Sequence, residues 1–139
     1  MYEEVYLDEE IRAVLKETRV IAMIGASANT ERPSYGVMKY LLGKGYTVHP
    51  INPGIAGQKL LGQTAYEKLS AVPGQVDMVD IFRNSEAARA AIACKVSLGI
   101  RTVWMQIGVR NDIAKQEAEA AGLRVIMNRC PKIEYSRLC

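Results

Sequence analysis

The chain alternates short apolar runs with longer stretches in which apolar residues recur every three or four positions. Because the apolar runs lack polar alternation, they are typical of strands buried on both faces. We predict five such strands, at residues 20–24, 46–49, 78–82, 102–107 and 123–127. The helical spacing predicts helices at residues 8–17, 33–43, 84–99 and 111–122. Residues 57–70 are less regular, and the residues after 127 are expected to form a short tail.

Strands that alternate with helices need crossover connections, so the sheet is expected to be parallel. The sequence therefore predicts the α/β class: a Rossmann-like, doubly wound parallel sheet of about five strands, with helices on both faces. We expect one domain over residues 1–139, with residues 1–17 as an N-terminal helical cover. With strands numbered along the chain, the expected order is 3-2-1-4-5. Ligands of such sheets bind beyond the carboxyl ends of the strands.

Composition agrees with one globular domain, since 49% of the 139 residues are hydrophobic and 24% are charged. The three cysteines show no C-x-x-C spacing, so neither a disulfide framework nor a metal site is predicted. A reducing cytoplasm fits this cysteine usage. The acidic start and the lack of an apolar run of about 18 residues argue against export and membrane insertion.

The net charge of +3 hides an asymmetry, because the first ten residues hold five acids and no base. The remainder therefore carries a surplus of eight positive charges. Such a surplus suits a phosphorylated ligand, although solvated lysines and arginines explain most surpluses of this size. No motif of interleaved aromatic and basic residues supports nucleic acid as a partner.

The loop that follows the first predicted strand is the best candidate for a phosphate-binding turn. Gly25 lets a ligand approach the backbone, and Ser27, Asn29 and Ser34 offer hydrogen bonds beside the start of a helix. The alternative is that any parallel sheet needs a glycine-containing turn there. The loop does not complete the G-x-G-x-x-G pattern of dinucleotide-binding proteins.

A nicotinamide dinucleotide also needs a carboxylate near the end of the second strand, and residues 48–52 contain none. An NAD-type, adenine-cofactor-dependent oxidoreductase is therefore the weaker alternative. The turn at Asn52 and Pro53 is suited to flank an adenine, and Lys59 to meet a terminal phosphate. Lys59 is equally interpreted as a solvated surface residue.

Four polar residues stand at or near predicted strand ends. His49 is the single histidine and is interpreted as structural. Asp80 lies inside an apolar strand and needs a partner, such as Arg83 or backbone amides, and it is interpreted either as a polar residue at the cleft or as part of a structural ion pair. Gln106 ends the fourth strand, and Cys130 follows the fifth, so both are candidates to reach the cleft, with an inert buried thiol as the alternative for Cys130.

Six segments taken together are more specific than any of these residues: Ile24–Ser27, Arg32–Tyr35, Ile51–Pro53, Val76–Arg83, Val103–Val109 and Asn128–Pro131. They resemble the small stand-alone bacterial coenzyme A-binding proteins of the YccU type, over about residues 5 to 138. More distantly, the chain is similar to the CoA-binding domain of the succinyl-CoA synthetase α subunit. The resemblance implies that CoA is held by the turn at 25–30, the Asn52–Pro53 loop and the ends of the third and fourth strands.

The chain departs from the synthetase at two points. The synthetase has a lysine two residues after the glycine of its Pro-Gly turn, and Ile55 stands there in this chain. Arg32, Arg83 or Lys59 would then have to supply the phosphate contact. The synthetase also needs a domain with a phosphorylated histidine, and this sequence ends at Cys139 before any such domain. Ligase activity is therefore not expected.

The sequence and the resemblance together predict a module that binds coenzyme A or an acyl-CoA and has no catalytic residues of its own. An interaction module with a vestigial cleft is a further alternative. The expected partners are the CoA ligand and an unidentified protein, with no nucleic acid and no membrane. The predicted CoA-binding residues are Gly25, Ala26, Ser27, Asn29, Arg32, Ser34, Asn52, Pro53, Arg83, Gln106 and Cys130.

Overall fold

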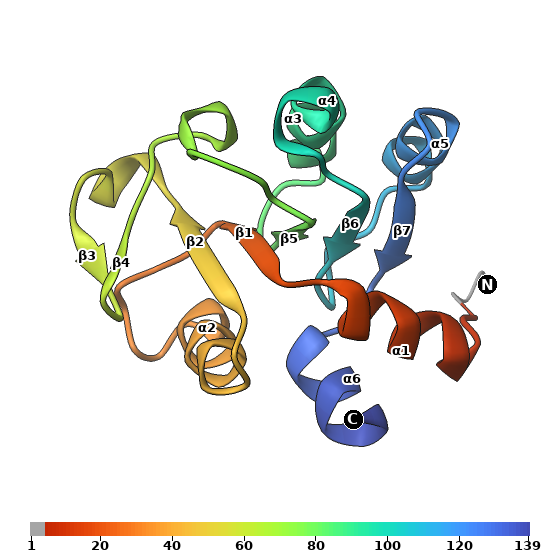
Figure 1. The fold of residues 1–139 in the computed structure, drawn as a ribbon, viewed down its shortest axis with the longest axis horizontal. Coiled ribbons are helices and arrows are strands. Elements are labelled where there is room, and N and C mark those ends of the chain that lie inside the picture. The colour runs from red at the N-terminus through yellow and green to blue at the C-terminus, as the bar shows by residue number, and fades with distance from the viewer. Residues whose placement is uncertain (1–4) are drawn as a thin grey trace.

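A central parallel sheet lies between two layers of helices in the computed structural model, which describes residues 5–139 (Figure 1). The first four residues, including two acids of the acidic start, lie outside the described residues. The strands of the sheet are β1 (Val20–Ile24), β2 (Thr47–Ile51), β5 (Met78–Ile81), β6 (Thr102–Met105) and β7 (Arg124–Met127). The predicted α/β class and the Rossmann-like parallel sheet of five strands are confirmed.

The strand order is β2-β1-β5-β6-β7, so the predicted order 3-2-1-4-5 is wrong. The third long strand, β5, pairs with β1 on the side away from β2. The position of β2 at the edge of the sheet is explained by Pro50. This residue belongs to β2, although the predicted strand ends at residue 49. Proline has no N–H to donate to a second neighbour, so it is accepted in an edge strand and not between two strands.

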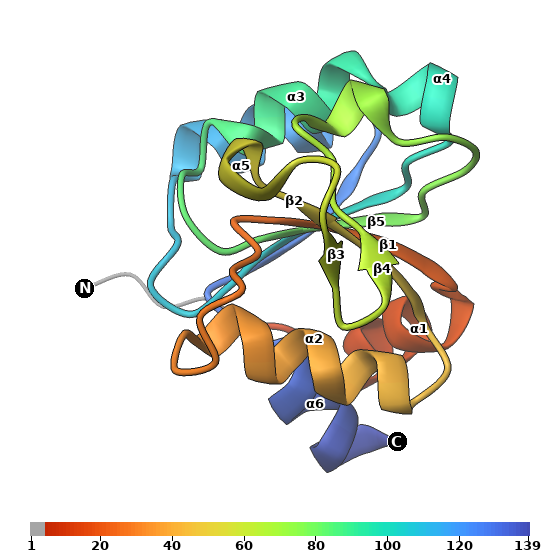
Figure 2. The same cartoon turned by 90° about the vertical axis from the view of Figure 1, so that its left-hand side faces the viewer.

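Helices cover both faces of the sheet (Figure 2). One face carries α1 (Asp8–Glu17), α2 (Pro33–Gly43) and α6 (Pro131–Leu138), and the other carries α3 (Ala87–Ala93), α4 (Lys95–Leu98) and α5 (Asp112–Ala120). The expected single helix over 84–99 is thus divided into α3 and α4, and the expected short tail forms α6. The predicted helix starts hold for α2, which has a proline in its first turn, and for α5, where the Asn111 side chain accepts from Ala114 N at 3.0 Å.

The strands bury alternate side chains in two cores. Ile21, Met23 and Trp104 pack with the helices α1, α2 and α6, whereas Ala22 and Val103 pack with α3 and α5. All five side chains are fully buried. This two-sided burial explains why the strands show no polar alternation in the sequence.

The irregular region between β2 and β5 contains a two-stranded antiparallel hairpin, β3 (Lys59–Leu60) and β4 (Gln63–Thr64). The hairpin lies beside the β2 edge of the main sheet (Figure 2). Tyr66 N donates to Pro50 O at 2.9 Å, and Asn52 N donates to Tyr66 O at 2.9 Å, so the segment after the hairpin protects this edge. Within residues 5–139 no helix is both long and apolar enough to span a membrane.

Candidate functional site

The winding direction of the sheet reverses between β1 and β5, which places their carboxyl ends side by side. Gly25 follows β1 with φ +91°, a backbone conformation that favours glycine. Its N–H donates to Ile51 O at 3.1 Å, and Phe82 N donates to Ile24 O at 2.9 Å. The loops after β1 and β5 are therefore in contact at the position where this fold class binds ligands.

A cavity of about 530 Å³ opens on one side of these loops, between α2, α6 and the ends of β5 and β6. We call it the α2-side cavity. Its wall is part apolar, from Val37, Phe82 and two exposed isoleucines, and part polar, from serine, glutamine and arginine side chains. The lining residues are Gly25, Ser27, Arg32, Pro33, Ser34, Val37, Phe82, Arg83, Gln106, Ile107, Cys130 and Ile133.

A second cavity of about 320 Å³, the α3-side cavity, opens on the other side of the same loops. It is lined by Ile24, Gly25, Ile51, Asn52, Pro53, Glu67, Lys68, Leu69, Arg83, Asn84, Ala87 and Ala90. Gly25 and Arg83 line both cavities. The two spaces therefore meet across the carboxyl edge of the sheet at these two residues.

Two arginine side chains lie at or beside the junction. Arg32 and Arg83 are exposed and form no ion pair with any carboxylate among residues 5–139. The start of α2, which carries the positive end of the helix dipole, also faces the α2-side cavity at Pro33 and Ser34. Two unpaired guanidinium groups beside a helix start suit a phosphate-bearing ligand.

Most of the predicted site residues line one cavity or the other. The α2-side cavity contains Gly25, Ser27, Arg32, Ser34, Arg83, Gln106 and Cys130, and the α3-side cavity adds Asn52 and Pro53. The other two predicted residues line neither cavity. Ala26 is fully buried, and its carbonyl accepts from Asn52 Nδ2 at 2.8 Å. The exposed Asn29 accepts from Glu31 N at 3.0 Å within its own turn.

Several lining residues were not predicted as site residues. Lys68 follows the irregular hairpin region and belongs to no recognisable motif. Ile107 and Ile133 are 61% and 51% exposed, and they form an apolar rim of the α2-side cavity. Ile133 lies on α6, in the segment that was predicted to be a short tail. Ile107 stands directly after Gln106, so its place beyond a strand end was available in the sequence.

Asp80 faces the α2 side of β5 and is fully buried. Burial raises the pKa of its carboxyl group well above the ordinary value. The prediction that Arg83 is the partner of Asp80 is wrong. The hydrogen bonds between the two residues require the Gln106 amide to place its nitrogen toward Asp80. In this orientation Nε2 donates to the two carboxyl oxygens of Asp80 at 3.1 and 3.2 Å. A buried carboxyl group thus touches a residue of the cavity wall.

His49 and Lys59 lie outside both cavities. The His49 ring meets the Tyr66 ring edge-on, with ring centroids 5.8 Å apart, and burial lowers the pKa of the imidazole. Lys59 Nζ donates to Thr64 Oγ1 at 2.9 Å within the hairpin. Of the three cations considered for the missing phosphate contact, only Arg32 and Arg83 reach the cavities.

Replacing Gly25 by alanine is expected to lower the free energy of unfolding by about 1 to 3 kcal/mol. A Cβ there would lie 3.0 Å from Arg83 Cγ and 3.2 Å from Phe82 Cβ, on a backbone with φ +91°. Thermal and urea unfolding measure the change. Gly36→Ala is the control, because a Cβ at this helical position has no neighbour within 4 Å. Equal stability of both variants would contradict this account of Gly25.

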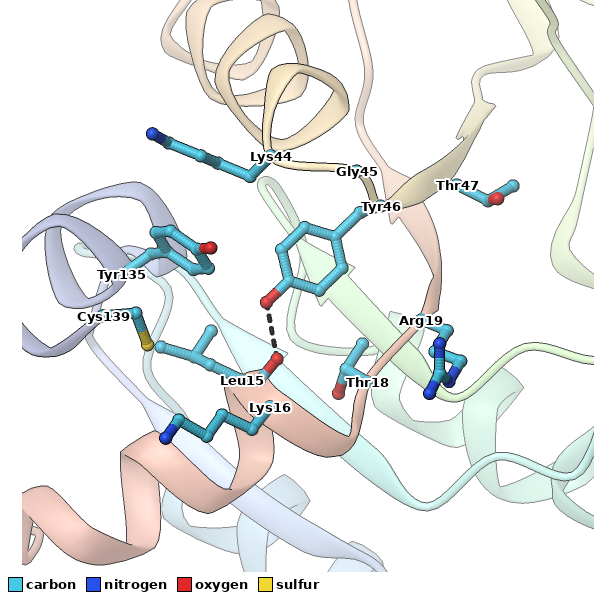
Figure 3. Close-up of a pocket in the computed structure, with 10 residues that line it drawn as sticks. All are labelled: Leu15, Lys16, Thr18, Arg19, Lys44, Gly45, Tyr46, Thr47, Tyr135 and Cys139. Carbon is cyan, nitrogen blue, oxygen red and sulfur yellow. Dashed lines mark hydrogen bonds between the residues drawn. The ribbon is translucent and has the colours of Figure 1, made fainter.

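A further cavity of about 550 Å³ lies at the opposite, amino edge of the sheet (Figure 3). The ends of α1, α2 and α6 converge there, and Tyr46 donates from its hydroxyl to Leu15 O. Lys16 and Lys44 border it, where cations complement the negative ends of helix dipoles. The lysines thus have a structural explanation, and the cavity contains no predicted site residue.

Comparison with protein families finds one match, to the CoA binding domain, over residues 19–136. Among curated proteins, the uncharacterized protein YneT of Bacillus subtilis is 32% identical over 127 residues, which cover 91% of this chain and 93% of YneT. The family match spans all the residues that line the two cavities.

Solved structures of similar size share the fold closely. A hypothetical protein from Pyrococcus horikoshii is 34% identical, with a TM-score of 0.88 and 99% of each chain covered. A protein from Thermus thermophilus is also 34% identical, with a TM-score of 0.87 and coverage of 96% of this chain and 100% of that one. An acetyl-coenzyme A synthetase of Candidatus Korarchaeum cryptofilum matches 78% of this chain with 26% of its own, at 25% identity and a TM-score of 0.62.

Proposed function

The chain belongs to the CoA binding domain family, and we propose that it binds coenzyme A or an acyl-CoA as a stand-alone module without catalysis of its own. The observation that carries the proposal is the pair of cavities that meet at Gly25 and Arg83. Coenzyme A is itself a three-part ligand, in which a diphosphate joins a phosphorylated adenosine to a pantetheine arm. The site has the same three-part division.

The chemistry of each part suggests how the ligand lies. The diphosphate belongs at the junction, beside Arg83, Arg32 and the start of α2, because these groups supply the positive charge. The adenosine and its 3′-phosphate belong in the α3-side cavity, where Pro53 offers a flat apolar surface and Lys68 a cation. The pantetheine arm then occupies the α2-side cavity, which has an apolar rim of Ile107 and Ile133 beside the amide of Gln106.

We propose no catalysis because no histidine, aspartate or glutamate is among the residues that line the α2-side cavity with Cys130. Thioester hydrolysis needs an activated water, or a nucleophile with an adjacent base. Cys130 lines the α2-side cavity after β7, whereas His49, the single histidine, lies on β2. These two strands are the opposite edges of the sheet. This separation argues against a cysteine-histidine pair.

Coenzyme A is expected to raise the melting temperature more than NAD at equal concentration. A ligand that binds only the folded state stabilises it by about 2.7 kcal/mol when its concentration is 100 times its dissociation constant. Differential scanning fluorimetry with matched concentrations of both ligands measures the shifts. Native mass spectrometry of co-purified small molecules supports the identification. A larger shift with NAD would favour the oxidoreductase alternative and overturn the proposal.

The purified chain is expected to release no thiol from acyl-CoA substrates above the background rate. A thiol-release assay with acetyl-, succinyl- and longer-chain acyl-CoA tests this, run beside Cys130→Ser. The serine variant keeps the shape of the side chain and removes the one thiol among the residues that line the α2-side and α3-side cavities. Turnover that is present in the wild type and absent from the variant would make Cys130 a nucleophile and end the non-catalytic interpretation.

A further inference from the structure

Asp80 is the buried group that packing explains least. The side chains on its row of the sheet, Met23 on β1 and Trp104 on β6, are apolar and fully buried. An apolar residue at position 80 would continue this row without the cost of removing a carboxyl group from water. A polar residue at such a position suggests a role outside the core.

The side chain that meets Asp80 is part of the ligand cavity. Gln106 follows β6, and its N–H donates to Ile81 O at 3.0 Å, which anchors its backbone beside β5. Its side chain is 6% exposed and lines the α2-side cavity. With its nitrogen toward Asp80, the side-chain amide donates to the two carboxyl oxygens at 3.1 and 3.2 Å, and these contacts hold the amide in place. The contact therefore links the core directly to the cavity wall.

We propose that Asp80 is a positioning residue that fixes the Gln106 amide, so that Gln106 recognises the pantetheine arm of the ligand. This inference rests on the proposed function. A primary amide carries both a donor and an acceptor, so Gln106 pairs with the carboxyl group in either protonation state. An amide held in one orientation selects the matching edge of a ligand amide, and the pantetheine arm contains two amides.

The remaining wall of the α2-side cavity agrees with this ligand part. Ile107, Ile133 and Phe82 provide apolar surface for the methylene and methyl groups of the arm. Arg83 lies at the junction with the α3-side cavity, where phosphates are expected, and Arg32 lines the α2-side cavity. Gln106 is therefore placed to distinguish intact coenzyme A from its nucleotide half.

Isothermal titration with coenzyme A and with adenosine 3′,5′-bisphosphate tests the inference on Gln106→Leu, Asp80→Leu, Asp80→Asn and the double leucine variant. Each single leucine variant is expected to weaken coenzyme A binding about tenfold, the loss of one oriented hydrogen bond. The double variant is expected to lose no more than either single variant, because the two residues act as one unit. Asp80→Asn keeps a polar partner for the amide and is expected to restore most of the affinity.

The bisphosphate lacks the pantetheine arm, so its affinity is expected to stay within about twofold in every variant. Equal losses for both ligands would show a structural role for Asp80 and overturn the inference. Unchanged coenzyme A affinity in Asp80→Leu, with the loss confined to Gln106→Leu, would also overturn it. Failure of the wild type to bind coenzyme A would instead reject the proposed function.

A second measurement covers the case in which Asp80→Leu does not fold. The side-chain NH₂ resonances of Gln106, assigned from their loss in Gln106→Leu, are expected to move in Asp80→Asn. In the wild type they are expected to move on addition of coenzyme A and to stay in place with the bisphosphate. NH₂ resonances of Gln106 that stay in place both in Asp80→Asn and on addition of coenzyme A would contradict the positioning role.

Discussion

Replacing Arg83 by alanine is expected to weaken coenzyme A binding by about 10- to 100-fold at low salt. Arg83 lines both cavities and has no carboxylate partner among residues 5–139, so its charge is available to the ligand. A charge-assisted hydrogen bond is worth about 1.5 to 3 kcal/mol, which corresponds to this range. Isothermal titration of the wild type and the variant measures it.

Salt and matched variants separate a phosphate contact from a loss of packing. The deficit of Arg83→Ala is expected to shrink at high salt, because exposed charges are screened. Arg83→Lys keeps the charge without the planar fork and is expected to be intermediate. Arg89→Ala is the control, since Arg89 pairs with Glu117 on the surface and lines neither cavity. An affinity for coenzyme A that is unchanged at both salt concentrations would remove Arg83 from the site.

Replacing Asp77 by alanine is expected to lower the free energy of unfolding by about 2 to 4 kcal/mol at neutral pH. Asp77 is buried at the start of β5, and its Oδ2 accepts from the backbone N–H groups of Arg19 and Val20, each at 2.9 Å. Its Oδ1 accepts from Gln75 at 3.0 Å and from Arg101 at 3.2 Å. Alanine would leave the two backbone donors at the start of β1 without an acceptor.

The contribution of Asp77 to the free energy of unfolding is expected to decrease in acid. Burial alone would raise the pKa of Asp77, but the N–H groups of Val20 and Arg19, with Arg101 and Gln75, hold it below its ordinary value. The stabilisation is therefore complete above the unfolded-state pKa, about 3.9, and is lost as the pH falls through the folded-state pKa. Urea unfolding at pH 7 and in acid measures the free energies of unfolding of the wild type and Asp77→Ala, and their difference is expected to be smaller in acid. Equal stability at pH 7 would contradict this role.

Some residues of the candidate site are predictable from the local sequence, and others are not. Gly25 and Ser34 follow from a strand, a turn and a helix start in succession, and Gln106 follows from its place at a strand end. Ala26 and Asn29 belong to the same loop, but one packs inward and the other closes its own turn. Nothing local marks Lys68 as a lining residue, because its position depends on how the hairpin region folds back on β2.

The sequence by itself determined the fold class, the five strands and most helices, since these depend on periodicity, on prolines at helix starts and on glycines at turns. Only the tertiary structure decided the strand order, which depends on which edge can accept Pro50 and is set by pairing between distant segments. That order brings the loops after β1 and β5 together, joins the two cavities at Gly25 and Arg83, and separates His49 from Cys130. It also gives Asp80 its partner in Gln106, because a buried polar group takes the donor that packing brings within reach, whatever residue stands next to it in the chain.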